Sequence, residues 1–156
     1  MKRKRIALKL VLAAAGTFCG AWVARGDAAS CTISAVGVSF GTYNVFSASP
    51  LDSTGSVTYT CTGIKPPDRV TINLSRGGAP TFSARQMFKS AVTLTYNLYL
   101  DAARTTIWGD ATSGTSHYGP VAPVSNATIT IYGRIPAGQD ASAGSYIDTV
   151  VATINF

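Results

Sequence analysis

The sequence predicts an all-β protein, a sandwich or a barrel, and three observations lead to this class. Short stretches in which apolar and polar residues alternate recur at 31–40, 56–61, 70–75, 94–100, 128–132 and 150–156. This alternation is typical of strands that bury one face, and β-branched and aromatic residues dominate these stretches. Glycine, proline, serine and aspartate separate them at 49–55, 65–68, 76–80, 109–120 and 136–140. After residue 28, no segment has a sustained helical period with capping residues.

The first predicted strand changes its inward parity partway along. Cys31 and Ile33 occupy odd positions, whereas Val38 and Phe40 occupy even ones. One extra residue turns every later side chain to the opposite face, so a bulge or a crossing between sheets is expected at 35–37. The middle strands have the inward sets Val57, Tyr59 and Cys61; Val70, Ile72 and Leu74; Leu94, Tyr96, Leu98 and Leu100; Ile129 and Ile131.

The first 28 residues predict a secretory signal peptide. A basic start, MKRKRIALK, precedes an apolar run at 10–24 that is too short for a membrane span and is soon followed by Arg25 and Asp27. Cleavage after Ala28 places small residues at the recognition positions, although cleavage after Ser30 would do the same. We therefore expect a mature domain of residues 29–156 that is exported through the periplasm to the cell surface or the extracellular space.

Most of the net positive charge of the whole chain comes from the predicted signal peptide. Six of the 13 basic residues and one of the seven acidic residues lie within it, which leaves a mature net charge of about +1. The formal charge of +6 therefore gives no support to a nucleic-acid partner. We also expect no insertion of the mature chain into a membrane.

Two cysteines remain after removal of the signal peptide, Cys31 and Cys61. An even pair in an exported chain predicts a disulfide, and their parities place both thiols inward, between the first two strands. A lipidated N-terminal Cys31 is the rival interpretation. The nearby Arg25 and Asp27, and the Cys61 that it would leave unpaired, weigh against it.

Residues suited to catalysis are scarce. The chain has one histidine, His117, and no glutamate, and no nucleophile elbow, metal-ligand cluster or phosphate-binding glycine pattern is present in the sequence. We therefore predict a protein that is not an enzyme and has no catalytic residues, cofactor or metal.

One loop combines aromatic and hydrogen-bonding residues, as a carbohydrate site would. Trp108, Asp110 and Tyr118 are its candidate ligand residues, and a secreted carbohydrate-binding β-sandwich module is accordingly the alternative function. The competing interpretation is that Trp108 packs in the core and that Gly109 and Asp110 form a turn.

The order and spacing of several motifs resemble those of spore coat protein U domains, a family similar to the pilus subunits of the archaic chaperone-usher pathway. The motifs are CTIS at 31–34, VSFGTY at 38–43, SVTYTC at 56–61, YNLYLD at 96–101, IWGD at 107–110, IYGRIP at 131–136 and GSYIDT at 144–149. The resemblance implies an incomplete immunoglobulin-like sandwich that lacks its last strand. It also implies a secreted structural or adhesive subunit of a pilus, fimbria or coat, with a role in cell adhesion or biofilm. Its partners would be a periplasmic chaperone, an outer-membrane usher and other pilin-like subunits.

The end of the chain fits this resemblance. Subunits of this type have a glycine twelve residues before a near-terminal aromatic, and here Gly144 precedes the last residue, Phe156, by that distance. We expect the last strand to form a strand-exchange edge, which accepts a strand from another chain. The apolar residues at the end of this strand face inward. The residues of the strand-exchange edge are Gly144, Val150, Ala152, Ile154 and Phe156.

The beginning of the mature chain departs from polymerising pilins, which carry a donor segment before the first cysteine. Cleavage after Ala28 leaves only Ala29 and Ser30 there, whereas a donor strand needs roughly 10 residues. The sequence therefore predicts a subunit that accepts a strand without donating one, at a fibre terminus such as the tip or in a non-polymerising coat.

Overall fold

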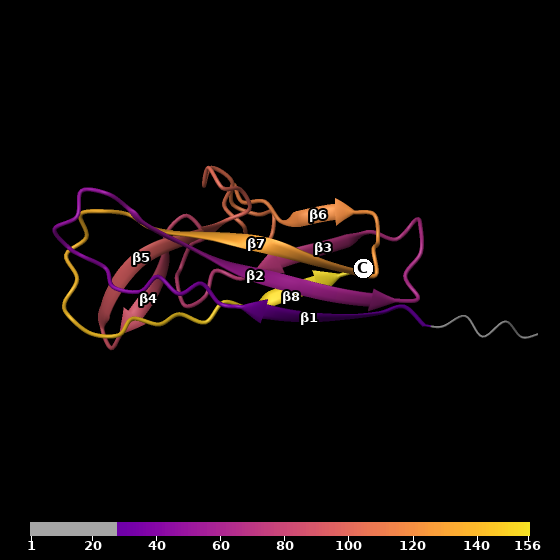
Figure 1. Cartoon of the computed structure of the whole chain (residues 1–156), viewed down its shortest axis with the longest axis horizontal. Helices are drawn as coiled ribbons and strands as arrows, with labels where there is room; N and C mark the ends of the chain where they lie inside the picture. The colour runs from indigo at the N-terminus through magenta and orange to yellow at the C-terminus, as the bar shows by residue number, and fades with distance from the viewer. Residues whose placement is uncertain (1–27) are drawn as a thin grey trace, which may run out of the picture.

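The computed structural model describes residues 28–156, which form eight strands joined by turns and loops (Figure 1). The predicted all-β class and sandwich architecture are confirmed. The strands are β1 (Ser30–Val36), β2 (Leu51–Thr62), β3 (Val70–Leu74), β4 (Arg85–Lys89), β5 (Val92–Tyr99), β6 (Tyr118–Val121), β7 (Asn126–Ile135) and β8 (Ala152–Asn155).

Two antiparallel sheets enclose the core. One has the strand order β1-β2-β7-β5-β4 and the other the order β6-β3-β8. The apolar faces of β2, β3, β5 and β7 meet between them, as the alternation predicted. The most deeply buried apolar side chains are Val57, Tyr59, Val70, Ile72, Trp108 and Ile135.

Two predicted boundaries were wrong because pairing with a neighbour overrides local composition. Residues 51–55, expected in a turn, belong to β2, where Leu51 lies opposite Ile135 and Gly55 opposite Ile131 of β7. At the other end of the chain, only Ala152–Asn155 of the predicted strand pairs with β3. The sequence also gave no prediction of β4 or β6, which contain Arg85 and the Gly119-Pro120 pair respectively.

The predicted disulfide forms between Cys31 and Cys61. These residues lie directly opposite each other on β1 and β2, with their Cα atoms 4.1 Å apart. Cys61 is buried and Cys31 packs against the core. The bond therefore ties the edge strand β1 to β2, its one sheet partner within residues 28–156.

The predicted change of parity after Ala35 corresponds to the end of β1. The chain leaves the ladder after Val36, and residues 37–43 follow without being part of a strand. Val38 and Phe40 then pack over Gly133, where a Cβ atom would come within 2.7 Å of each side chain. Gly133 thus provides the space that lets this segment lie on the sheet.

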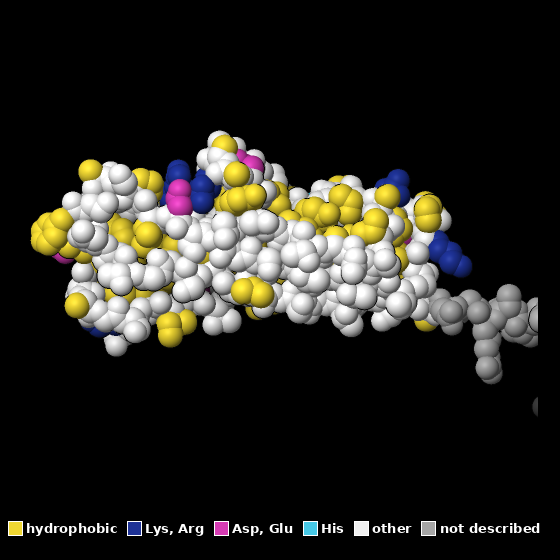
Figure 2. Space-filling view, viewed as in Figure 1, with side chains coloured by type: hydrophobic (Ala, Val, Ile, Leu, Met, Phe, Trp, Pro, Cys, Tyr) yellow, Lys and Arg dark blue, Asp and Glu magenta, His cyan; other side chains and the backbone are white. Residues whose placement is uncertain are grey.

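Charged side chains are sparse on the surface. On the face that Figure 2 shows, they gather in small groups separated by broad uncharged areas. The described part of the chain contains no helix with the length and hydropathy of a membrane span.

Candidate functional site: an open groove beside the core

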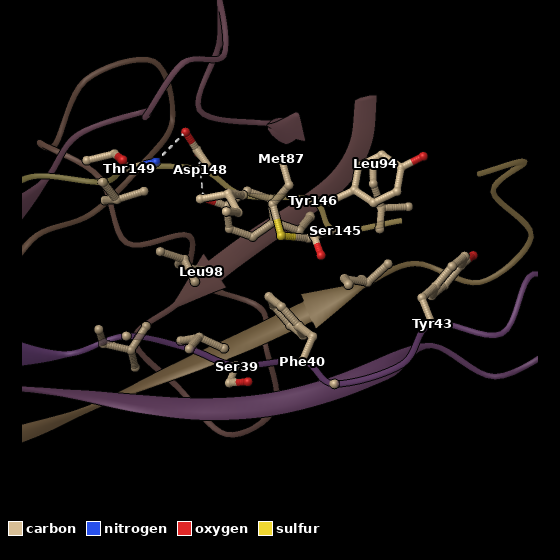
Figure 3. A pocket seen from close by; sticks show the side chains of 18 of the residues that line it. Ser39, Phe40, Tyr43, Met87, Leu94, Leu98, Ser145, Tyr146, Asp148 and Thr149 are labelled. Atoms are coloured by element: carbon tan, nitrogen blue, oxygen red, sulfur yellow. Dashed lines mark hydrogen bonds between the residues drawn. The ribbon is translucent and has the colours of Figure 1, made fainter. Parts of the chain in front are cut away.

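A groove with a volume of about 880 Å³ opens between two segments that flank the sandwich (Figure 3). One wall is residues 35–43, the end of β1 and the segment that follows it, and the other is residues 141–150, which precede β8. Core side chains form its floor, among them Val57, Leu94, Leu98, Ile131 and Ile135. We call this feature the open groove. It is a hollow above the packed core, and the floor side chains named here are themselves at most 5% exposed.

The first wall is held in place at Phe40 and at Tyr43. The Phe40 ring meets the Tyr96 ring edge-on, with centroids 6.0 Å apart. Further along, the Tyr43 hydroxyl donates to the Pro136 carbonyl at 3.0 Å and accepts from the Gln139 backbone N–H at 2.9 Å. This wall is therefore anchored by one aromatic contact and by two hydrogen bonds to the loop after β7.

The second wall is joined to β4. Ile147 and Phe88 exchange two backbone hydrogen bonds, with N–O distances of 2.8 and 3.1 Å. Next to them, the Asp148 carboxylate accepts from the Tyr96 hydroxyl at 2.7 Å and from the Gly78 N–H at 2.9 Å. Burial raises the pKa of Tyr96, and the bond to Asp148 raises it further, so the hydroxyl remains a donor.

Gly144 lies on this wall rather than on β8. Its φ of +144° is one that residues with a side chain rarely adopt, and the Lys89 side chain passes directly over it. Lys89 donates to the Ala143 carbonyl and to the Ser142 hydroxyl. The glycine therefore permits a close approach between the wall and the end of β4.

Of the other residues of the predicted strand-exchange edge, Val150 and Ala152 line the open groove. Val150, Ala152 and Ile154 are half-buried against the core. Phe156 does not share their position, since it is 49% exposed and lies beyond the last residue paired with β3. Within residues 28–156, the other edge of β8 has no strand partner, and neither does the outer edge of β1.

Sequence reasoning identified only part of the two walls. It placed Gly144 and Val150 of the second wall in the strand-exchange edge. At 35–37 it expected a bulge or a crossing between sheets, without indicating that residues 37–43 line a groove. The bond between Tyr96 and Asp148 joins residues 52 positions apart. No local pattern could reveal that contact.

The predicted ligand loop does not assemble. Trp108 is fully buried, and its Nε1 donates to the Ile72 carbonyl at 2.8 Å. Because it belongs to the core, it has no ring face to offer to a sugar, which corrects the expectation for this residue. Tyr118 packs near it, with ring centroids 6.4 Å apart. Asp110 accepts from the Thr112 N–H at 3.0 Å, as in the turn interpretation.

Comparison with known proteins identifies similar sequences and a matching family model. The family model of the Spore Coat Protein U domain matches residues 22–153. Protein U of Myxococcus xanthus is 38% identical over 134 residues, which cover 76% of this chain and 71% of that protein.

A similar fold occurs in a solved structure of Acinetobacter baumannii, described as the CsuC-CsuE chaperone-tip adhesion subunit pre-assembly complex from archaic chaperone-usher Csu pili. The TM-score is 0.55 at 21% identity. The match covers 83% of this chain but only 40% of the matched chain. Since the match to the family model extends over most of the sequence, the chain belongs to the Spore Coat Protein U domain family.

Proposed function

We propose that this protein is a non-enzymatic structural or adhesive surface subunit whose open groove is completed by a strand from another chain. The observation that carries the proposal is the groove itself, with core side chains as its floor and the unpaired edges of β1 and β8 beside it. Unpaired N–H and C=O groups next to an apolar groove are what strand addition uses. Membership of the family supports the pilus or coat type of subunit.

The dimensions of the open groove suit one extended strand. Its walls, 35–43 and 141–150, are each about as long as a strand of nine or ten residues, roughly 30 Å when extended. Side chains of such a strand alternate between the floor and solvent. The incoming segment should therefore carry apolar residues at every second position.

Insertion of a strand that pairs with both β1 and β8 would have to move β1. In Figure 1, β1 and β8 lie side by side, and Cα atoms of the two strands approach within 8 Å. A strand paired with both would hold them about 9.6 Å apart, twice the usual spacing between neighbouring strands. A full insertion therefore parts β1 from β8, whereas the open groove between residues 35–43 and 141–150 is already accessible.

The partners follow from the kind of assembly in which the similar fold occurs. The solved complex contains a chaperone and a tip adhesion subunit. By analogy, a periplasmic chaperone would fill the open groove first, and an outer-membrane usher would exchange it for another pilin-like subunit. The site of action would be the cell surface.

Paired variants test the groove. Val150 lines it and is half-buried, whereas its neighbour Val151 is 58% exposed and does not line it. We expect the exported protein, produced with a periplasmic immunoglobulin-like chaperone, to yield a one-to-one complex by size exclusion and mass spectrometry. Val150→Arg should reduce the yield of complex at least tenfold, because it would put a charge on the wall of an apolar groove. Val151→Arg should leave it unchanged.

Hydrogen exchange provides a second measurement on the same samples. The amides of β1 and β8 should become protected in the complex, since the added strand pairs with their edges. Equal complex yields for the two arginine variants, or a wild-type chain that is a stable soluble monomer when produced alone, would contradict strand completion of this groove.

The position at a fibre terminus rests on a mature N-terminus too short to donate a strand. The signal peptide lies outside the described residues apart from Ala28. N-terminal sequencing of the exported protein should give a start at residue 29, within a few residues. A start near residue 15 would leave a long extension and would overturn the terminal position, without affecting the role of the open groove.

A further inference from the structure

A second concave feature lies apart from the open groove and shares no residue with it. This polar cleft has a volume of about 490 Å³, within the range of small-molecule sites. Its walls come from the loop after β3, the segment before β4 and the loop after Trp108. The residues that line it are Ser75, Arg76, Pro80, Thr81, Phe82, Ser83, Asp110, Thr112 and Ser113.

The walls of the polar cleft are held by Arg85 and Asn97, the two buried side chains of charged or amide type in residues 28–156. Arg85 donates to the Ser75 carbonyl at 2.9 and 3.1 Å and to the Trp108 carbonyl at 2.6 Å. Its Nη1 also donates to Asn97 Oδ1 at 2.7 Å. Each of these carbonyls belongs to a residue in the cleft wall or adjoining it.

Asn97 completes the support from the same point. Its Nδ2 donates to the carbonyls of Phe82 and Ser83 at 2.9 and 3.1 Å. One buried pair therefore fixes all three segments that form the polar cleft. Burying a guanidinium costs free energy unless its donors are satisfied. A buried guanidinium whose hydrogen bonds hold the walls of one cleft indicates a preorganised site.

Two opposite charges face the polar cleft without pairing. Arg76 donates from Nη1 to the Pro80 carbonyl at 2.9 Å, and Asp110 Oδ1 accepts from the N–H and the hydroxyl of Thr112 at 3.0 and 2.5 Å. Among the described residues neither forms an ion pair within 4 Å. The hydrogen bond from the Thr112 hydroxyl lowers the pKa of Asp110, which is therefore a carboxylate at neutral pH. The guanidinium of Arg76 and Asp110 Oδ2 retain hydrogen-bonding capacity for a ligand.

Phe82 adds an apolar surface to the polar cleft. The guanidinium of Arg85 lies 5.3 Å from the centroid of its ring, and this contact orients the side chain. An oriented aromatic ring beside five serine and threonine hydroxyls, one cation and one carboxylate is suited to a sugar, whose ring has both C–H and hydroxyl faces.

We propose that the polar cleft binds a sugar that carries a carboxylate, such as a hexuronic acid unit of an extracellular polysaccharide. Arg76 binds the sugar carboxylate, Asp110 and the hydroxyls of Thr81, Ser83 and Ser113 bind ring hydroxyls, and Phe82 packs against the C–H face. The acidic class follows from Arg76, whose planar guanidinium matches a carboxylate in a two-point contact. The two features share no residue, so a variant in the lining of one leaves the lining residues of the other unchanged.

The test uses the exported protein, purified with the partner that occupies the open groove. Trigalacturonic acid is titrated into ¹⁵N-labelled protein, with neutral maltotriose as the matched ligand. We expect trigalacturonic acid to shift the amides of Arg76, Phe82, Asp110 and Thr112 in a saturable manner, and maltotriose to bind at least tenfold more weakly. The variant Arg76→Gln should weaken binding of the acidic sugar tenfold or more, because it removes a charge-assisted contact.

The control variant is Arg69→Gln, which removes an exposed cation outside the polar cleft. It should leave the affinity unchanged. The proposal is overturned if the cleft amides do not shift, if maltotriose binds as tightly as the acidic sugar, or if both glutamine variants lose the same affinity. Thermal unfolding at an unchanged temperature in both variants shows that the fold is retained.

Discussion

The variant Arg85→Ala is expected to lower the free energy of unfolding by about 3–5 kcal/mol. Arg85 is fully buried and donates to three acceptors, the carbonyls of Ser75 and Trp108 and the Asn97 side chain. Alanine leaves all three without this donor and opens a cavity beneath the polar cleft. Relief of the cost of burying the charge offsets only part of this loss. Urea denaturation of the oxidised protein measures the change.

Two further variants separate the causes of that loss. Arg69→Ala removes an exposed cation and should change stability by no more than about 0.5 kcal/mol. Arg85→Lys keeps the charge and most of the stem, but an ammonium cannot bridge the same three acceptors, so we expect an intermediate loss. Arg85→Ala unfolding within about 1 kcal/mol of the wild type would show that the buried network contributes little.

Removal of the disulfide is expected to cost about 3–4 kcal/mol in the double variant Cys31→Ser with Cys61→Ser. The bond spans a sequence separation of 30 residues and joins the edge strand β1 to β2, its sheet partner in the described part of the chain. Its loss increases the entropy of the unfolded chain and also loosens a strand beside the open groove. Urea denaturation with and without a reducing agent measures the effect.

The neighbouring cross-strand pair provides the control for the disulfide. Thr32 lies opposite Thr60, one position along the same ladder, and both side chains are exposed. The double variant Thr32→Ala with Thr60→Ala should lose less than about 1 kcal/mol. A wild-type midpoint that does not respond to reduction would contradict a stabilising role for the bond.

The parts of the fold that the sequence predicted are those in which one face of a strand is buried. In β3 and β5, apolar residues such as Ile72 and Leu98 occupy every second position, and both strands were predicted close to their observed bounds. β4 was missed because its most buried residue is Arg85, which by composition should be exposed. Hydrogen bonds from distant segments make that burial possible, and no window of sequence contains them.

The residues of the candidate site also include some that the sequence predicted correctly and some that it did not. The alternation of Val150, Ala152 and Ile154 indicated a half-buried terminal strand, and these three residues do pack against the core. The last member, Phe156, follows the same parity but lies past the end of the pairing with β3, where no sheet neighbour holds it inward. The loop residues Trp108 and Asp110 were grouped by proximity in sequence, although the structure buries the first and leaves the second at a different site.

By itself, the sequence determined the all-β class, the cysteine pair and the family. Periodicity, residue type and motif spacing are visible in the order of residues along the chain, without knowledge of distant contacts. Only the tertiary structure decided where the sandwich is open and which polar groups meet. Contacts such as Tyr96 with Asp148, and Arg85 with the Trp108 carbonyl, join separate segments. Their partners are set by how the two sheets and their loops pack together, and that arrangement depends on the whole chain at once.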